Sequence, residues 1–246
     1  MTETAVVARR LSVGYGTKVI LSGVDAFLKP GGSTALVGSN GSGKSTLLKT
    51  LAGLLPVIDG GLEVLGRPVG ELTAKVAYLS QFHQSGFVLP LQAIDVVRMA
   101  RYDQRSRWQR RTKIDDEIVK ESMKLMCVDD LALKPLRDLS GGQQQRAALA
   151  RCLVQKARII LADEPIASLD PESSRKVMDL LQQLNQTHHC TVLVSLHQVE
   201  YAIKYCPRTI ALNAGRVVYD GPSSELTPEL LAELYGSNAS ELFAEH

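Results

Sequence analysis

Residues 38–45, GSNGSGKS, constrain the fold of this chain more than any other part of the sequence. They fit the pattern G-x-x-x-x-G-K-[ST] at every fixed position. The residues before the pattern are typical of a buried strand, and the leucines after it recur at helical spacing as far as Pro56. Gly41 and Gly43 let successive backbone N–H groups point inward, and the helix N-terminus adds partial positive charge. A strand, a loop and a helix in this order predict a phosphate-binding site in an α/β fold.

The residue types in this loop indicate its ligand. Lys44 is placed to reach the β- and γ-phosphates of ATP as a point charge, and Ser45 to supply its hydroxyl to Mg²⁺. We therefore expect ATP and Mg²⁺ as cofactors. A glycine-rich turn that matches by chance is the alternative, and the flanking strand and helix argue against it. The residues expected to contact ATP in this stretch are Gly38, Ser39, Asn40, Gly41, Ser42, Gly43, Lys44, Ser45 and Thr46.

Two acidic residues follow another apolar strand. Residues 159–162 are apolar, and Asp163 stands at their carboxyl end, where ligands of open α/β sheets bind. Asp163 is expected to hold the Mg²⁺ through water, and Glu164 to polarise the water that attacks the γ-phosphate. Acidic residues after a strand also occur as simple helix caps, and the phosphate loop upstream favours the catalytic interpretation.

Strand and helix signals alternate along most of the chain, except between about 91 and 154, where helical patterns stand almost alone. A last helix is expected with Thr227 as N-cap, Pro228 at its first position and Gly236 at its end. These signals predict a mostly parallel α/β core that carries an all-helical subdomain. Strands are expected over 5–13, 18–24, 26–38, 75–81, 157–163, 190–196 and 208–221, and helices over 44–55, 93–102 and 113–128.

Composition narrows the classes of function. A formal net charge of +2 gives no case for binding nucleic acid, and no apolar run approaches the roughly 20 residues that cross a bilayer. The first ten residues lack the features of a signal peptide, so we expect a cytoplasmic chain unless a partner holds it elsewhere. The basic stretch 105–113, RSRWQRRTK, is typical of a solvated helix face, and the alternative is contact with acidic lipid head groups or a membrane partner.

A second glycine-rich site is indicated by LSGGQ at 139–143, directly before a helical run. One interpretation is an ordinary N-cap, with Ser140 bonding the first turn of its own helix. The other is a second anion-binding helix N-terminus. The two are compatible, because a capped helix end also binds anions. Composition alone does not explain why one chain carries two such sites.

The chain carries six motifs in this order: GSNGSGKST, YLSQ, LSGGQ, ILADEP, SLD and SLH. With these motifs in the family's order, it resembles the ATP-binding subunits of ABC (ATP-binding cassette) transporters, and the resemblance covers essentially the whole chain. It implies a P-loop NTPase (RecA-like) core with an N-terminal antiparallel β subdomain and an inserted ABC helical subdomain. The single domain 1–246 then divides into 1–90 and 155–246 for the core and β subdomain, and 91–154 for the helical subdomain. It also implies ATP hydrolysis.

The resemblance answers the question of the two sites. In this family two copies pack head to tail, and the signature loop of one closes on the γ-phosphate held by the other. The residues implied to serve a partner chain's ATP are Ser140, Gly141, Gly142, Gln143 and, at the dimer interface, Asp170.

Three further roles are implied residue by residue. Tyr15 matches the aromatic residue that stacks on adenine, although a surface tyrosine of a sheet is the alternative. Gln81 matches the glutamine that touches Mg²⁺ and the attacking water. His197 matches the histidine that contacts the γ-phosphate, against the alternative of a structural histidine.

The resemblance also implies the partners: a second copy, transmembrane permease subunits, and indirectly an external substrate-binding protein, with the chain at the cytoplasmic face of the membrane. Two kinds of importer are resembled by different parts of the chain. ATPases of phosphonate importers are resembled by PIASLDPES, LHQVEYAIKYC and VVYDG, and those of zinc and manganese importers by FVLPLQAIDVVRMARY. This mixture is compatible with a natural chain and with a recombined one. Because permease docking in the family uses the metal-like part, we expect metal cargo ahead of phosphonate. A soluble ABC ATPase that moves no cargo is the alternative.

Overall fold

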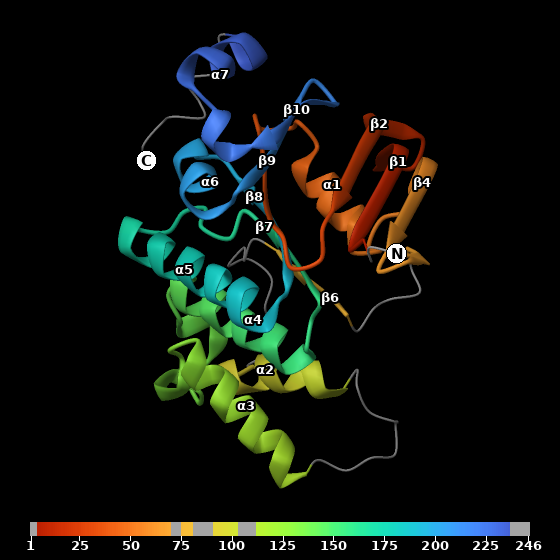
Figure 1. Ribbon diagram of the computed structural model, residues 1–246. Helices are drawn as coiled ribbons and strands as arrows, with labels where there is room; N and C mark the ends of the chain where they lie inside the picture. Colours follow the sequence, from red (N-terminus) through yellow and green to blue (C-terminus); the bar gives the residue numbers. More distant parts are fainter. Residues whose placement is uncertain (1–3, 70–74, 81–90, 103–111, 237–246) are drawn as a thin grey trace.

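The computed structural model describes residues 4–69, 75–80, 91–102 and 112–236, which form two β-sheets and seven α-helices in these ranges (Figure 1). The first sheet is antiparallel, in the order β2-β1-β4-β5. Its strands are β1 (Val6–Tyr15), β2 (Lys18–Leu28), β4 (Val57–Val64) and β5 (Arg67–Pro68). The second sheet has the order β10-β9-β3-β8-β7-β6 and is parallel except for β10. Its strands are β3 (Ser33–Gly38), β6 (Val76–Leu79), β7 (Ile159–Asp163), β8 (Thr191–Leu196), β9 (Arg208–Asn213) and β10 (Arg216–Pro222).

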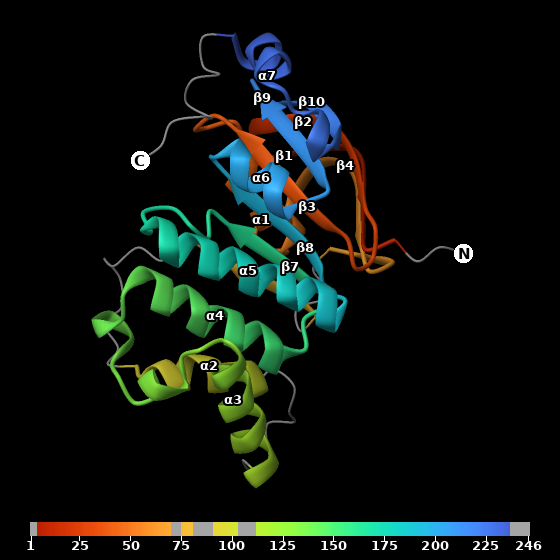
Figure 2. The same cartoon turned by 60° about the vertical axis from the view of Figure 1, so that its left-hand side comes forward.

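The central strands of the six-stranded sheet are buried on both faces, and their side chains alternate between two cores. Ile159 and Leu161 pack into one core with α1 (Lys44–Leu51) and the antiparallel sheet. Ile160 and Ala162 pack into the other core with the remaining helices. Figure 2 shows the resulting layers, with α1 and the antiparallel sheet on one side of the six-stranded sheet.

The helices of the second core are α2 (Ala93–Tyr102), α3 (Lys113–Leu125), α4 (Gly141–Gln155), α5 (Pro171–His188), α6 (Val199–Tyr205) and α7 (Pro228–Tyr235). Short 3₁₀ turns lie at Asp129–Leu131, Leu136–Asp138 and Ser223–Glu225. In Figure 1, α2 and α3 lie furthest from the sheets, and α4 lies between them and α5. An insertion of helices between β6 and β7 fits the predicted helical subdomain, and its exact limits, 91 and 154, stay a prediction.

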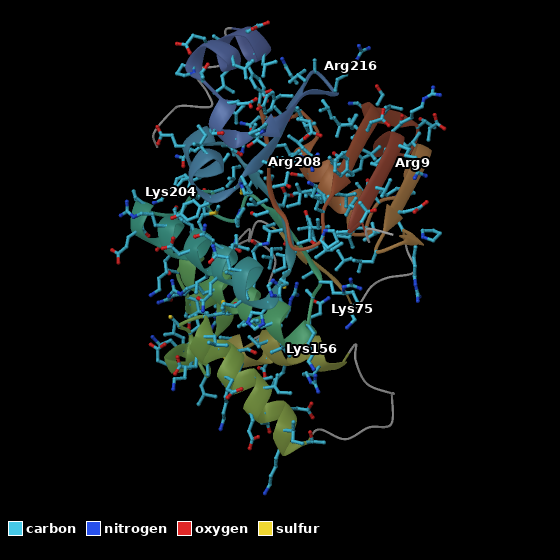
Figure 3. All side chains as sticks on the ribbon, in the orientation of Figure 1. Arg9, Lys75, Lys156, Lys204, Arg208 and Arg216 are labelled. Carbon is cyan, nitrogen blue, oxygen red and sulfur yellow. The ribbon has the colours of Figure 1, made fainter. Side chains whose placement is uncertain are left out.

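Arg208, labelled in Figure 3, joins the two sheets. Its guanidinium bonds both oxygens of Asp220 at 2.7 Å, donates to the carbonyl of Phe27 on β2, and lies over the Phe27 ring. The antiparallel sheet is therefore fixed against the β9–β10 edge of the parallel sheet.

The expected α/β class is confirmed, and so is the last helix, which has Thr227 as N-cap and Pro228 in its first turn. Strand β4 was not expected. In its sequence, VIDGGLEV, two glycines interrupt the alternation of apolar residues, and only Leu62 and Val64 of this strand are buried. Gly60 there has φ 86° and lies so close to β1 that an added Cβ would be 2.4 Å from the Arg10 carbonyl oxygen.

Other expected limits also differ from the structure. The expected strand 208–221 is two strands, β9 and β10, separated by a turn at Ala214 and Gly215. The expected strand 26–38 is divided by a turn at 29–32 between β2 and β3, where Pro30 and Gly31 interrupt the ladder. The expected helix 44–55 ends at Leu51, and the expected helix 113–128 ends at Leu125. Beyond Leu125, Cys127 has φ 54°, a left-handed conformation that stops a helix. None of the helices within the described ranges is long and apolar enough to span a membrane.

Candidate functional site

The phosphate loop joins the end of β3 to the start of α1. Gly43, the N-cap, has φ 103°, and an added Cβ would lie 2.6 Å from Cγ of Leu21. A Cβ at Gly38 would lie 2.5 Å from the carbonyl oxygen of Leu212 on the neighbouring strand β9. The glycines of the pattern are thus required by conformation and by packing, and the loop is held tightly between two strands and a helix.

Lys44 begins α1 and is only 4% exposed. Its Nζ donates to the carbonyl oxygens of Gly38 at 2.7 Å and Ser39 at 3.2 Å. Burial lowers the pKa of Lys44, while the carboxylates of Glu164 and Asp163 act in the opposite direction. The ammonium group is therefore fixed within the loop and near two acidic side chains.

The Asp163 carboxylate lies at the carboxyl end of β7 and is 5% exposed. Its Oδ1 accepts from the hydroxyls of Ser45 at 3.0 Å and Ser195 at 2.9 Å, and its Oδ2 accepts from the hydroxyl of Tyr78 at 2.8 Å. Burial, and then Asp163, raise the pKa of Tyr78, so its hydroxyl keeps the proton that it donates. Three neighbouring strands and the phosphate loop thus meet at one carboxylate.

Glu164 follows directly and has φ 49°, a left-handed conformation that is rare for a residue with a side chain. Its N–H donates to the hydroxyl of Ser195 at 2.8 Å, and its Oε1 lies 2.7 Å from Nε2 of His197. The structure therefore brings Glu164 and His197, from the ends of two adjacent strands, into contact. A cavity of about 610 Å³ opens beside them, lined by Ser39, Asn40, Glu164, Leu169 and His197 among others.

The residues of the loop fit a bound phosphate and a divalent cation. Oγ of Ser42 is buried and, within the described part of the chain, has no hydrogen-bond partner. A phosphate oxygen would supply the partner that this hydroxyl lacks. The hydroxyl of Ser45 and the carboxylate of Asp163 are hard oxygen donors, 3.0 Å apart, of the kind that Mg²⁺ prefers.

The signature residues form the start of α4. The hydroxyl of Ser140 accepts from N–H of Gln143 at 3.3 Å, and Oε1 of Gln143 accepts from N–H of Ser140 at 2.9 Å. The two side chains form a capping box, so the N-cap interpretation of Ser140 is confirmed. A Cβ at Gly141 would lie 2.8 Å from Cδ2 of Leu169, and one at Gly142 would lie 2.9 Å from Cβ of Ser173. The glycine pair therefore packs closely against the start of α5.

The other predicted residues are dispersed. Asp170 is exposed and caps α5, accepting from N–H of Ser173 at 2.9 Å, and its pKa is lowered mainly by hydrogen bonds from Ser173. Tyr15, at the end of β1, is 48% exposed, and Thr46 is buried in α1. Gln81 and residues 105–111 of the basic stretch lie outside the described residues.

Sequence reasoning missed Tyr78 and Ser195, which both bond Asp163. One signal was available. Ser195 is a polar residue between two apolar residues of a fully buried strand, and such a residue needs a hydrogen-bond partner. Tyr78 carried no comparable signal, because its partner is 85 residues away.

Comparison with known proteins agrees with this geometry. Residues 21–167 match the family described as ABC transporter. The phosphonates import ATP-binding protein PhnC of Paraburkholderia xenovorans is 45% identical over 256 residues, covering 98% of this chain and 85% of that protein. A solved structure described as a metal-chelate type ABC transporter in an inward-facing conformation has a TM-score of 0.83 at 27% identity, covering 94% of this chain and 89% of that one.

A third similarity concerns a nucleotide-bound state. The dimeric ATP-binding cassette MJ0796, in a post-hydrolysis state with ADP and Pi, has a TM-score of 0.76 at 27% identity. The match covers 89% of this chain and 98% of that one. With the phosphate loop, the acidic pair and the signature helix in place, these matches show that the chain belongs to the ABC transporter family, as an ATP-binding and ATP-hydrolysing subunit.

Proposed function

We propose that this chain powers a phosphonate importer by hydrolysing ATP at two sites shared between two copies of itself. The observation that carries the proposal is the meeting of Ser45, Asp163, Glu164 and His197 beside the phosphate loop. These side chains come from three separate segments and form two contacting pairs, Ser45 with Asp163 at 3.0 Å and His197 with Glu164 at 2.7 Å.

Each residue has a distinct role in this proposal. Lys44 and the loop N–H groups bind the β- and γ-phosphates, and Tyr15 stacks on adenine. Ser45, Asp163 and Gln81 hold Mg²⁺, which supplies positive charge to the phosphates when bound. Glu164 accepts a proton from water while the water oxygen bonds to the γ-phosphorus. The bond from that phosphorus to the β-phosphate oxygen breaks, and ADP and phosphate result.

His197 is suited to orient Glu164. Its Nε2 lies 2.7 Å from Oε1, a separation at which the imidazole fixes the position of that carboxylate. The same imidazole borders the cavity in which a γ-phosphate would lie. This supports the assignment of Glu164 and His197 as catalytic residues, whereas Gln81 is assigned as the third on the family resemblance alone.

The signature residues serve the nucleotide of a second copy in this proposal. Ser140, Gly141, Gly142 and Gln143 begin a helix of 15 residues, whose N-terminus attracts anions. Asp170 then lies at the interface of a head-to-tail dimer. The dimeric form of the related cassette MJ0796 supports this arrangement.

The cargo assignment rests on the curated relatives. Our expectation of metal ahead of phosphonate is not supported, because the PhnC resemblance, at 45% identity, spans the helical segment 91–154 as well as the rest of the chain. The metal-chelate type structure matches at only 27% identity. We therefore place phosphonate first. The chain would be held at the inner face of the membrane by permease subunits, with a substrate-binding protein acting from the other side. A soluble ABC ATPase is the alternative.

Mixed dimers test the shared sites. Ser140→Arg in one chain and Lys44→Ala in the other should each abolish ATPase activity as homodimers, because each then has two damaged sites. The mixed dimer has one site with both defects and one intact site, so part of the activity should return. A Glu164→Gln version of the mixed dimer is the control. A dimer that forms without recovering activity would contradict the proposal.

Cargo is tested separately in cells that lack this chain. Uptake of a labelled phosphonate should fall to background and return with the wild-type chain but not with Lys44→Ala. Uptake of zinc and manganese should not change. The reverse pattern would restore the metal assignment, and no change in either would favour a soluble ATPase.

A further inference from the structure

The hydrogen bonds around Asp163 are divided unequally between its two oxygens. Ser45 and Ser195 both donate to Oδ1, at 3.0 Å and 2.9 Å. The hydroxyl of Tyr78 donates to Oδ2, at 2.8 Å. Ser45 belongs to the metal site itself, whereas Tyr78 lies on strand β6 and has no assigned role. Its hydroxyl therefore bonds the carboxylate oxygen that Ser45 does not bond.

The position of the Tyr78 hydroxyl is fixed by its backbone and its ring. In the parallel ladder, Tyr78 pairs with Leu161 of β7, two residues before Asp163. The outer edge of β6 is held by α4, because Arg151 Nη2 donates to the Tyr78 carbonyl at 3.2 Å and Gln155 Nε2 donates to that of Val76 at 3.1 Å. The ring packs against the apolar core beneath the antiparallel sheet.

A carboxylate that is held on one oxygen only can still rotate, because the terminal torsion of an aspartate has broad minima. Donors on both oxygens, from different strands, remove that freedom. A carboxylate that is already oriented loses less entropy when it holds the ion, directly or through water, and hydrogen-bond partners behind metal-binding groups commonly affect metal affinity by 10–100-fold.

We propose that Tyr78 is a positioning residue for the Mg²⁺ that accompanies ATP. Its hydroxyl occupies Oδ2 of Asp163 and so keeps Oδ1 turned toward Ser45. Tyr78 does not touch nucleotide or metal in this inference, and it acts only through Asp163. The inference rests on the proposed function, since it assumes that Ser45 and Asp163 hold the ion.

The test compares nucleotide affinity with and without the ion. All variants carry Glu164→Gln, so that the nucleotide persists, and the affinity for a fluorescent ribose-labelled ATP is measured in EDTA and in Mg²⁺. Tyr78→Phe removes one oxygen atom. Its affinity in EDTA should stay within about twofold of the parent, whereas the gain in affinity from Mg²⁺ should fall by about tenfold. Asp163→Asn marks the loss expected when the ligand itself is removed.

Tyr205→Phe is the matched control. The hydroxyl of Tyr205 donates to Oδ1 of Asp179 at 2.9 Å, so the same atom and the same kind of bond are removed from α6 and α5. The thermal stability of Tyr205→Phe measures how much the loss of such a bond destabilises the fold. Its gain in ATP affinity from Mg²⁺ should equal that of the parent Glu164→Gln chain. Tyr78→Met, which keeps apolar bulk without a hydroxyl, replaces Tyr78→Phe if that variant does not fold, and it should show the same selective loss.

The outcomes separate this inference from the proposed function. If Tyr78→Phe gains as much affinity from Mg²⁺ as Tyr205→Phe does, the positioning role is wrong and the ATP site stands. If Tyr78→Phe loses affinity equally in EDTA and in Mg²⁺, its role is structural and the inference is also wrong. If the parent chain itself binds no labelled ATP, the proposed function fails first.

Discussion

Two serines near the phosphate loop should respond in opposite ways to the same change. Ser195 is fully buried, accepts from N–H of Glu164 at 2.8 Å and donates to Asp163 at 2.9 Å. Ser42 is also buried, and its hydroxyl has no partner within the described residues. Replacing each with alanine removes one oxygen atom. The difference between the two variants therefore measures what the hydrogen bonds of Ser195 contribute.

The magnitudes follow from those contacts. Ser195→Ala loses one bond between neutral groups, about 1 kcal/mol, and one to a carboxylate, about 1.5–3 kcal/mol. A loss of roughly 3 kcal/mol should lower the Tm by about 6–12 °C in a domain of this size. Ser42→Ala loses no such bond and removes a buried unsatisfied hydroxyl, so its stability without nucleotide should be unchanged or about 1 kcal/mol higher.

The nucleotide separates the two variants further. Near 100 times the Kd, ATP should stabilise the wild-type chain by about 2.7 kcal/mol. If the Ser42 hydroxyl bonds a phosphate oxygen, a tenfold weaker Kd would remove about 1.4 kcal/mol of that gain. Urea unfolding followed by circular dichroism, with and without Mg²⁺ and ATP, measures both effects. Equal destabilisation by the two substitutions without nucleotide, or a full nucleotide gain in Ser42→Ala, would refute the reasoning.

Three further predictions concern residues of the proposed sites. Glu164→Gln should bind ATP within about twofold of wild type and hydrolyse it at least about 100-fold more slowly, and near-normal turnover would contradict its role as base. Gly142→Ala should lower the free energy of unfolding, measured with urea, by about 1–3 kcal/mol, because the new Cβ would lie 2.9 Å from Cβ of Ser173. Gly141→Ala should lower it less, because the Leu169 side chain that it meets can rotate. Asp170→Ala should lower the Tm at neutral pH. Hydrogen bonds lower the pKa of Asp170, so its contribution to stability is complete above the ordinary pKa and is lost as the pH falls through the lowered value. The Tm values of wild type and Asp170→Ala should therefore converge in acid. A difference in Tm that stays constant with pH would contradict the role of Asp170 as a cap.

The parts of the fold that could be predicted are those with a local signal. The phosphate loop has its strand, its glycines and its helix within about 20 residues, and each is specified by neighbours in sequence. Thr227 and Pro228 likewise specify a helix start without any distant contact. Strand β4 lacked such a signal, because its course depends on the close approach of Gly60 to the backbone of Arg10 on another strand.

The candidate site was only partly predictable, for a related reason. Lys44, Ser45, Asp163 and Glu164 lie in recognisable motifs, and the structure places them together. The partners of Asp163 depend on strand register, which a single sequence does not specify. Ser195 is the register partner of Asp163 in the β7–β8 ladder, and a shift of one residue would turn its hydroxyl to the other face.

The segment between Glu164 and Asp170 connects the proposed base to the glycines that we propose serve a partner's nucleotide. It begins at Glu164, the proposed base, has left-handed conformations at Glu164 and Ser168, and ends at Asp170, which caps α5. On its way it places Leu169 so close to Gly141 that no methyl group would fit between them without a shift. Gly142 lies almost as close to Cβ of Ser173, which cannot rotate away, so a displacement of the start of α5 would also displace the start of α4. The glycines are thus needed inside their own chain for packing, and in the proposed head-to-tail dimer the same helix start would connect Glu164 to the nucleotide of the partner.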